Sequence, residues 1–169
     1  MINSYNINYI DVIGENFTTM PCYARGEKYS DIMWNGATPI SQDALDALIL
    51  AAVKRERILD LSDSAHGEII SGFLSNALGS GYYYDSDQED QLNLIGAVAS
   101  GASIPFSCRQ ALGGAKQYMI HTAAQLLQVL NDGKNVKLAV LQKFSIKKDI
   151  ILAASDIIAV EAITWESIP

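Results

Sequence analysis

A cluster of acidic residues follows three consecutive tyrosines in the stretch GSGYYYDSDQEDQLNL, which covers residues 79–94. Carboxylates this close together could hold a metal ion or supply acid and base groups to a reaction. A calcium loop of the EF-hand type that began at Asp85 would need glycine at its sixth position and glutamate at its twelfth. The sequence has Asp90 and Gly96 at these positions, so we do not expect this cluster to bind a metal.

The same acids fit the start of a helix. Ser86 and Glu89 have the S-x-x-E spacing of a capping box directly before an apolar run. The cluster also contains Asp85, Asp87 and Asp90. Negative charge is favourable there, because the N-terminal end of a helix carries a partial positive charge. We therefore predict that Ser86 caps a helix over residues 87–99 and that the acids have a structural role.

Two other helix starts have similar signals. Thr122 and Gln125 have the T-x-x-Q spacing of a second capping box, again before an apolar run. Ser41 is a good N-cap, with Asp43 in the turn that follows. The helix that Ser41 starts is long for a globular protein, so a break near Ser62 is one alternative.

The three tyrosines suit a strand that is half buried. Side chains alternate along a strand, so Tyr83 would face away from Tyr82 and Tyr84. One face of the strand could enter the core while the other presents phenol groups, which are common at protein interfaces.

Other residues that could do chemistry lack the expected surroundings. Cys108 and His121 could be neighbours across a hairpin and resemble a thiol dyad, but nothing nearby in the sequence would activate the thiol. Glu68 and Glu89 could act as a carboxylate pair of the kind that cleaves sugars. Cys22 lies far from Cys108, which indicates two small buried hydrophobic residues rather than a disulfide. We expect no catalytic residues and no cofactor.

The elements that would position these residues fall into three groups. Residues 1–40 contain strand-like runs, NINYIDVI and FTTMPCYA, and end near the turn signal Asn35-Gly36. A long helix follows, with a buried stripe that includes Leu45 and Leu59. Two hairpin patterns, one around a Gly/Ser turn and one around Gly113-Gly114, then each precede a helix. A short last helix would begin at Ser155 or Asp156.

The composition is that of an ordinary globular chain. It has 169 residues, of which 49% are hydrophobic and 18% charged, and its net charge is -7. This length allows a substantial core. An acidic surface repels phosphate groups, so we do not expect nucleic acid as a partner. The sequence has no secretion-signal pattern and no apolar run long enough to cross a membrane, so we expect a soluble protein made in a cytoplasm.

Several segments between residues 55 and 165 resemble, in order and spacing, a domain of unknown function that is widespread in bacteriophages and prophages. That domain occurs mostly in genes for tail, tail-fibre and tail-fibre-assembly proteins. The combination of YDS…DQLNLIG with HTAAQ carries the resemblance. The residues that match its signature are Tyr84, Asp85, Asp90, Gln91, Asn93, Leu94, His121, Thr122 and Gln125. Residues 28–41, KYSDIMWNGATPIS, resemble small modules that precede this domain in phage tail proteins.

The resemblance implies a role in the virion or in its assembly, and it supplies no catalytic residues. We therefore expect an α+β protein with an N-terminal β docking module (1–40), a linking helix (41–66) and a hairpin-helix-hairpin-helix domain with terminal helices (67–169). The expected function is that of a structural component of the phage tail, at the baseplate or at the attachment of tail fibres. The protein would be made in the host bacterial cytoplasm and act by binding other tail proteins, as an oligomer or within a larger assembly.

Two alternatives remain open for the function. A tail-fibre assembly chaperone would bind fibre ends and leave before the virion is complete, and a tail-associated cell-wall hydrolase would be an enzyme. The candidate docking surface on the N-terminal module consists of its aromatic residues Tyr23, Tyr29 and Trp34. A module this small cannot build a strong core alone, so laying its strands or aromatic side chains on a partner would stabilise it.

Overall fold

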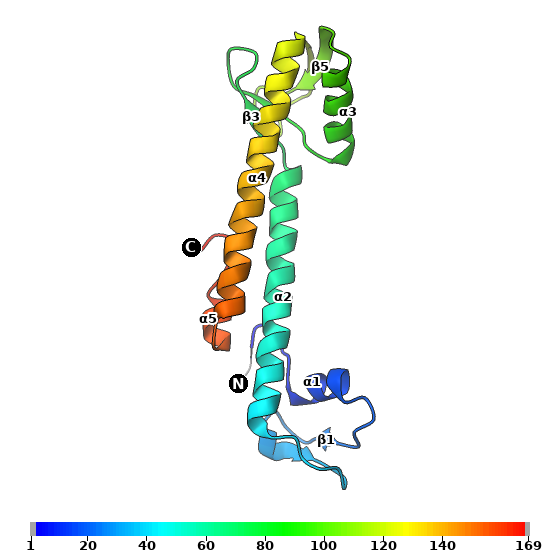
Figure 1. The fold of residues 1–169 in the computed structure, drawn as a ribbon, viewed down its shortest axis with the longest axis vertical. Helices are drawn as coiled ribbons and strands as arrows, with labels where there is room; N and C mark the ends of the chain where they lie inside the picture. The colour runs from blue at the N-terminus through cyan, green and yellow to red at the C-terminus, as the bar shows by residue number, and fades with distance from the viewer. Residues whose placement is uncertain (1–2, 168–169) are drawn as a thin grey trace. The chain divides into compact units, whose positions relative to one another are not determined.

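The computed structural model describes residues 3–167. Within this range the chain has the predicted α+β fold, with five α-helices and three small antiparallel sheets (Figure 1). The chain divides into two compact units. Unit 1 comprises the described parts of Met1–Leu61 and Ile146–Pro169, and unit 2 comprises Ser62–Ser145.

Unit 2 begins with a hairpin and a helix. β3 (Phe73–Ser75) pairs antiparallel with β4 (Tyr82–Tyr84), and α3 (Gln88–Ala99) follows. Gly79 in the connecting turn has a φ of 86°, a left-handed conformation that glycine adopts without steric cost. The predicted hairpin and helix are both confirmed here.

A second hairpin and helix complete unit 2. β5 (Ile104–Cys108) pairs with β6 (Gln117–His121), and α4 (Ala123–Ala153) follows, with its first part in this unit. Two backbone hydrogen bonds between Tyr83 and Arg109, with N···O distances of 2.8 and 2.9 Å, join the two hairpins. The pattern of a hairpin followed by a helix is therefore used twice, as predicted.

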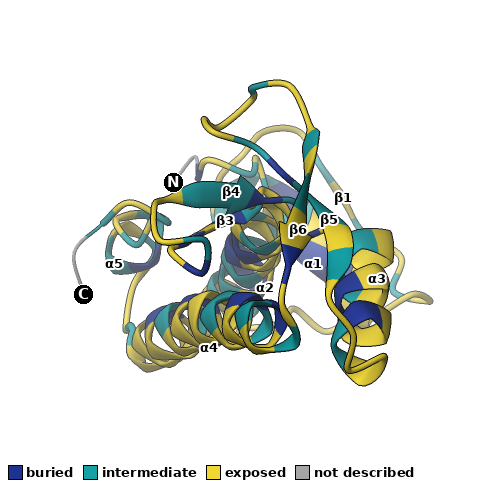
Figure 2. Cartoon of the chain, turned by 90° about the horizontal axis from the view of Figure 1, so that it is seen from above, coloured by how far each residue is buried: buried dark blue, intermediate teal, exposed yellow. Residues whose placement is uncertain are grey.

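The core of unit 2 lies between the hairpins and the two helices. Its buried residues come from every one of these elements: Phe73, Ala77, Tyr84, Leu94, Ala97, Cys108, Leu126 and Val129. Figure 2 shows α3 with buried residues along one side and exposed residues along the other. The helices are thus held by one apolar side each, as is usual for helices at the surface of a domain.

In unit 1 the run NINYIDVI was predicted to be a strand, but its last five residues begin the helix α1 (Tyr9–Asn16). A complete capping box starts it. Asn8 Oδ1 accepts a hydrogen bond from the backbone N–H of Asp11 at 3.2 Å, and Asp11 Oδ2 accepts one from the N–H of Asn8 at 2.8 Å. Val12 and Ile13 are buried. The strand prediction was wrong because this cap and the burial outweigh the β-preference of isoleucine and valine.

The rest of the N-terminal segment has little β-structure. β1 (Tyr23–Ala24) and β2 (Ile32–Met33) form a pair of only two residues each, and the 3-10 turn η1 (Tyr29–Asp31) precedes β2. The prediction of a β module is therefore wrong for most of residues 1–40, within the part that the structure describes.

The long helix α2 (Gln42–Ile70) is continuous through Ser62, where a break was an alternative. Ser41 starts it as predicted, because its Oγ accepts a hydrogen bond from the N–H of Ala44 at 3.3 Å. Leu59 was assigned to the buried stripe but is 52% exposed.

α4 likewise continues to Ala153, beyond the apolar pattern that predicted it. The last helix, α5 (Ile157–Glu161), is capped by Asp156, whose side chain accepts a hydrogen bond from the N–H of Ala159 at 2.8 Å. This agrees with the predicted start. No helix among residues 3–167 is long and apolar enough to cross a membrane.

The predicted domain boundaries lie after residues 40 and 66. The boundaries between the two compact units lie after residues 61 and 145 instead. Both α2 and α4 pass from one unit into the other. The N-terminal segment is bonded to later parts of unit 1, for example through the N–H of Ser4, which donates to Glu161 Oε1 at 2.5 Å. The chain therefore closes unit 1 from its two ends, a long-range arrangement that local sequence signals do not encode.

Candidate functional site

The acid cluster begins α3, but its capping residue is Asp87. Asp87 Oδ1 accepts a hydrogen bond from the N–H of Asp90 at 2.8 Å. Ser86 is buried, and its backbone carbonyl accepts a hydrogen bond from Gln91 Nε2 at 2.9 Å. The prediction that Ser86 caps the helix was wrong by one residue, because the D-x-x-D and S-x-x-E patterns overlap here. Glu89, the second member of the predicted box, is exposed.

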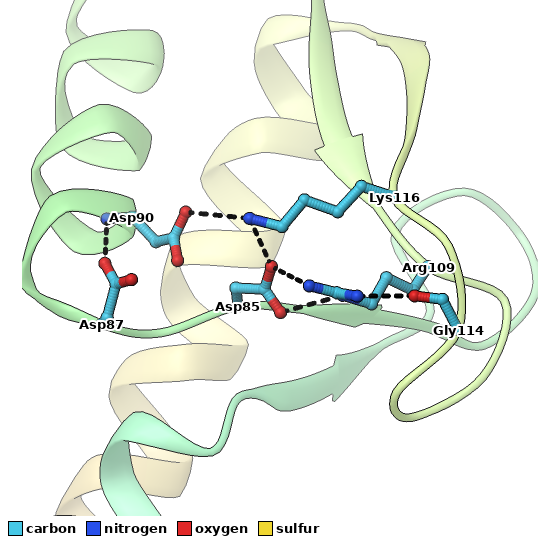
Figure 3. A network of polar contacts seen from close by, with 6 residues as sticks. All are labelled: Asp85, Asp87, Asp90, Arg109, Gly114 and Lys116. Carbon is cyan, nitrogen blue, oxygen red and sulfur yellow. Dashed lines mark hydrogen bonds and ion pairs between the residues drawn. The ribbon is translucent and has the colours of Figure 1, made fainter.

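Asp85 is the centre of a polar network that links the two hairpins (Figure 3). Arg109 binds its carboxylate through two hydrogen bonds, Nε to Oδ1 at 3.0 Å and Nη2 to Oδ2 at 2.8 Å. Lys116 Nζ lies 2.7 Å from the same Oδ2 and 4.0 Å from Asp90 Oδ1. Arg109 also donates from Nη1 to the carbonyl of Gly114 at 2.5 Å. The network fixes the loop of the second hairpin against the end of the first.

These contacts set the charges of the cluster. The hydrogen bond from Arg109 lowers the pKa of Asp85, and that from Lys116 acts in the same direction. Burial raises the pKa of Asp90, although Lys116 opposes the shift. The hydrogen bonds to Asp85 raise the pKa values of Arg109 and Lys116. The network is therefore a stabilised group of ion pairs. Sequence reasoning missed the two cations because they follow Asp85 by more than twenty residues.

Tyr84 and His121 form a buried pair with a defined proton arrangement. His121 Nδ1 lies 2.8 Å from the carbonyl oxygen of Met119, which can only accept, so Nδ1 carries the proton. Nε2 then accepts a hydrogen bond from the hydroxyl of Tyr84 at 2.8 Å. Burial raises the pKa of Tyr84, which keeps this hydroxyl protonated. The rings of Phe73 and Phe106 pack on the pair, at 5.8 Å from Tyr84 and 6.0 Å from His121.

The second capping box is confirmed. Gln125 Oε1 accepts a hydrogen bond from the N–H of Thr122 at 2.8 Å, and Thr122 Oγ1 accepts one from the N–H of Gln125 at 3.2 Å. Among the other signature residues, Gln91 also accepts a hydrogen bond from Lys137 of α4 at 3.4 Å, and Asn93 is exposed on α3. The signature residues that are not on the surface thus hold the hairpins and helices together.

The structure does not assemble the thiol dyad. Cys108 lies opposite Gln117 in the β5–β6 ladder, whereas His121 lies opposite Ile104 at the other end. Burial raises the pKa of Cys108, which is the opposite of what an activated thiol needs. The hypothesis of a Cys108–His121 pair was wrong because the register separates the two residues. Cys22 is also a free thiol.

Glu68 and Glu89, which the sequence offered as a carboxylate pair, lie in different surroundings. Glu68 Oε2 lies 3.6 Å from Lys143 Nζ in unit 2, and Glu89 lies on the exposed side of α3. Within residues 3–167 there is no group of three or more His, Cys, Asp or Glu side chains placed to hold a metal ion.

The predicted aromatic docking residues are partly brought together. The ring centroids of Tyr29 and Trp34 are 6.3 Å apart, and Tyr9 packs edge-on against Tyr29 at 6.0 Å. The hydroxyl of Tyr29 donates to the carbonyl of Ile40 at 2.7 Å. Tyr23, on β1, is 42% exposed. Tyr29 and Trp34 therefore serve the packing of unit 1, and Tyr23 is the most accessible of the three.

One face of the second hairpin is an exposed apolar surface of unit 2. Tyr118 and Ile120 of β6 are 74% and 64% exposed. Their partners across the ladder are Ser107 and Pro105. We call these four residues the outer face of β5–β6. Sequence reasoning missed this face, although the alternation in QYMIH was a signal for it.

Comparison of the chain with protein-family models, with curated proteins and with solved structures gives no match. The resemblance to the phage tail domain therefore stays a prediction from the sequence. All the residues that carry its signature lie in unit 2. There they form caps, ion pairs and the buried Tyr84–His121 pair, or lie in the core or at the surface of α3.

Proposed function

We propose that this protein is a structural, non-enzymatic component of a bacteriophage tail, at the baseplate or at the attachment of tail fibres. It acts by binding other tail proteins. The resemblance between residues 55 and 165 supports the setting, and the outer face of β5–β6 supports the mode of action.

The outer face carries this proposal because it combines exposure with rigidity. Tyr118 and Ile120 present a large apolar area to solvent, and tyrosine is enriched among the residues that dominate interface energies. The inward side chains of the same hairpin, Phe106 and His121, are packed in the core. A surface held in this way loses little conformational entropy when a partner binds.

The N-terminal segment supplies a second contact in this proposal. Residues 1–40 would dock on a neighbouring tail protein through exposed aromatic area, with Tyr23 as the accessible side chain. Tail structures are built on rotational symmetry, so the same patch would be used in every copy. The protein would accordingly work as an oligomer or within a multi-protein assembly.

Mass spectrometry of purified particles tests the proposal. We expect the chain in intact virions of the phage that encodes it. A fibre-assembly chaperone would instead be bound to fibre proteins in the lysate and be absent from particles. Absence from particles would overturn the proposal, and binding to fibre proteins in the lysate would then favour the chaperone.

A variant then tests the surface. Replacing Tyr118 by alanine and Ile120 by serine should weaken binding to the partner by about thirtyfold or more and lower incorporation into particles, since loss of an aromatic anchor costs about 2 kcal/mol or more. Leu92→Ser, at a 61% exposed apolar position on α3 outside this face, is the matched control and should enter normally. Normal incorporation of the double variant would exclude this face as the contact.

A further inference from the structure

Unit 1 contains a cleft of about 600 Å³ that the proposed function does not use. Four parts of the unit form it: the turn before α1 at residues 6–9, Glu27 in the loop between β1 and η1, the first turns of α2, and the junction of α4 and α5 at residues 155–157. The volume is within the range of sites that bind small ligands or a few side chains of a partner.

One part of the cleft is apolar. Its larger aliphatic side chains come from three of the four parts: Ile7, Ile49, Leu50 and Ile157. Ile49 is buried in the unit, while Leu50 and Ile157 are half-buried. An aliphatic side chain of a ligand would therefore remove apolar surface from water on both sides of the contact, which is favourable.

The charged groups of the cleft are all acidic. Glu27, Asp46 and Asp156 line it, and among residues 3–167 no lysine, arginine or histidine does. None of the three forms an ion pair with a cation among residues 3–167. Elsewhere the chain does pair its carboxylates, as in Asp85 with Arg109. The cleft thus has uncompensated negative charge next to an apolar surface.

The carboxylates are oriented by the fold and keep free acceptor capacity. The Tyr9 hydroxyl donates to Asp46 Oδ1 at 2.7 Å, and Asp156 Oδ1 accepts from the N–H of Ala159 at 2.8 Å. Burial and this hydrogen bond raise the pKa of Tyr9 to about 12, so the phenol remains a donor at neutral pH. An ionised carboxylate can accept several hydrogen bonds, so each has further capacity for a bound cation.

The wall of the cleft is held rigidly. Asn3 is buried, and its side chain bonds to the backbone of Ile7 twice: Nδ2 donates to the carbonyl at 2.7 Å and Oδ1 accepts from the N–H at 3.1 Å. Asn6, which lines the cleft, has a φ of 55°, an uncommon left-handed conformation for a residue other than glycine. Such a wall has little freedom to lose on binding.

A smaller hollow of about 360 Å³ shares Tyr9, Glu27 and Gln42 with the cleft. Lys28 lines this hollow, so its charge makes that end less suited to a cation. The site for positive charge is accordingly at Asp46 and Asp156.

We propose that this cleft binds a segment of a partner protein in which a lysine or arginine lies beside an aliphatic side chain. The cation pairs with Asp46 and Asp156, and the aliphatic group packs on Ile49 and Leu50. The inference rests on the proposed function only in taking the ligand to be a protein. It concerns a different unit from the outer face of β5–β6, and the two can fail separately.

The test uses the full chain and a panel of acetylated, amidated pentapeptides. Each has a central lysine or arginine flanked by leucine, isoleucine, valine or alanine, and each has a control with norleucine at the centre. We expect at least one member to bind with a Kd below about 1 mM in calorimetry, and its norleucine control to bind about tenfold more weakly. No binding by any member, or equal binding by the norleucine control, would overturn the proposal.

Substitutions of the two carboxylates test whether they pair with the cation of the peptide. Asp46→Asn and Asp156→Asn keep an oxygen for the Tyr9 hydroxyl and for the cap of α5, so both variants should fold. Each should weaken binding by about threefold, and the double variant by about tenfold, with a smaller effect at high salt. Asp63→Asn, an exposed carboxylate outside the cleft, is the matched control. Equal losses in the control would refute a specific site.

Amide chemical shifts locate the ligand. We expect peptide-induced changes at Ala47 and Ile157 in unit 1. Changes confined to Tyr118 and Ile120 would place the peptide on the outer face of β5–β6, which would support the proposed function and overturn the inference. Equal binding of propylamine alone would show a site for a free amine and would also overturn it.

Discussion

The two hairpin-helix halves of unit 2 use the same local pattern for different purposes. In the first half, the last residue of the hairpin, Tyr84, is 1% exposed and bonded to His121. In the second half, Tyr118 stands 74% exposed on the outer face of β5–β6. The pattern of hairpin, cap and helix therefore determines the architecture of each half, whereas the face on which an aromatic residue falls determines whether it stabilises the core or is available to a partner.

The helices of the two halves also differ in whether a glycine packs against a buried side chain. Gly133 of α4 lies against the buried ring of Phe73, where an added Cβ would be 2.7 Å from Cε1 and Cζ. At Gly96 of α3, apart from its chain neighbours and the backbone of its own helix, no described atom lies within 4 Å of the position that a Cβ would take. One glycine is needed for close packing of the first hairpin on α4, and the other leaves its helix without a side chain at an open position.

The largest expected difference concerns the two tyrosines. Tyr84→Ala removes a buried ring and leaves His121 without its hydrogen-bond donor, so it should lower the free energy of unfolding by about 3–5 kcal/mol. Tyr118→Ala should change it by less than about 0.5 kcal/mol, because the ring is exposed. Urea unfolding of the full chain, followed by circular dichroism, measures both. Similar losses in the two variants would contradict the division into core and surface halves.

Replacing the two glycines should change the free energy of unfolding by smaller amounts, with opposite signs for the two positions. Gly133→Ala should destabilise the chain by about 1–2 kcal/mol, since overpacking against Phe73 exceeds the gain in helix propensity. Gly96→Ala should stabilise it by up to about 1 kcal/mol, because only the propensity changes. Thermal unfolding compares the two variants. Stabilisation by both would show that Phe73 can move away from α4 at little cost.

The helix caps test the corrected position of the acid cluster. Asp87→Ala should cost about 1 kcal/mol, because Asp90 loses the acceptor for its N–H. Ser86→Ala should cost only a few tenths, since the backbone carbonyl of Ser86, not its side chain, accepts from Gln91. Asp87→Asn is the control that keeps the cap and removes the charge. A larger loss for Ser86→Ala than for Asp87→Ala would restore the original assignment.

The smallest expected effect is the pH dependence of the link between the halves. The pKa of Asp85 is lowered from its usual value of 3.8, so its contribution is present above that value and is lost as the pH falls through the lowered pKa. The pKa of Asp90 is raised, so ionisation of Asp90 lowers the free energy of unfolding. This destabilisation appears above pH 3.8. Unfolding between pH 2 and 4 should show that Asp85→Asn removes up to about 1 kcal/mol of the acid-side loss. An unchanged acid slope would exclude Asp85 as its source.

Local signals predicted much of unit 2 from the sequence. The box of Thr122 and Gln125, the start of α2 after Ser41 and both hairpins depend on residues a few positions apart, and these were found where predicted. The shift from Ser86 to Asp87 shows the limit of such signals, because two overlapping patterns differed by one residue. The strand predicted over α1 had a competing signal in the Asn8 and Asp11 cap, which was overlooked.

Long-range features could not be predicted. The cations of the Asp85 network, Arg109 and Lys116, come from a different hairpin, and only the register brings them to the carboxylate. The cleft in unit 1 needs four segments that are separated in the chain. Periodicity and caps describe neighbours in sequence, so they do not identify surfaces that form only when distant segments meet.

The closure of unit 1 from both ends of the chain has a consequence for synthesis on the ribosome. Ser4 emerges early, yet its partner Glu161 follows 157 residues later. Unit 2 is continuous in sequence and has all its hairpins and caps in place before that residue is translated. Domains fold as units when their residues have emerged, so unit 2 should form first and the N-terminal segment should wait for α5. During that interval the N–H of Ser4 lacks the carboxylate of Glu161 as its acceptor, so we expect unit 1 to close only after α5 has been translated.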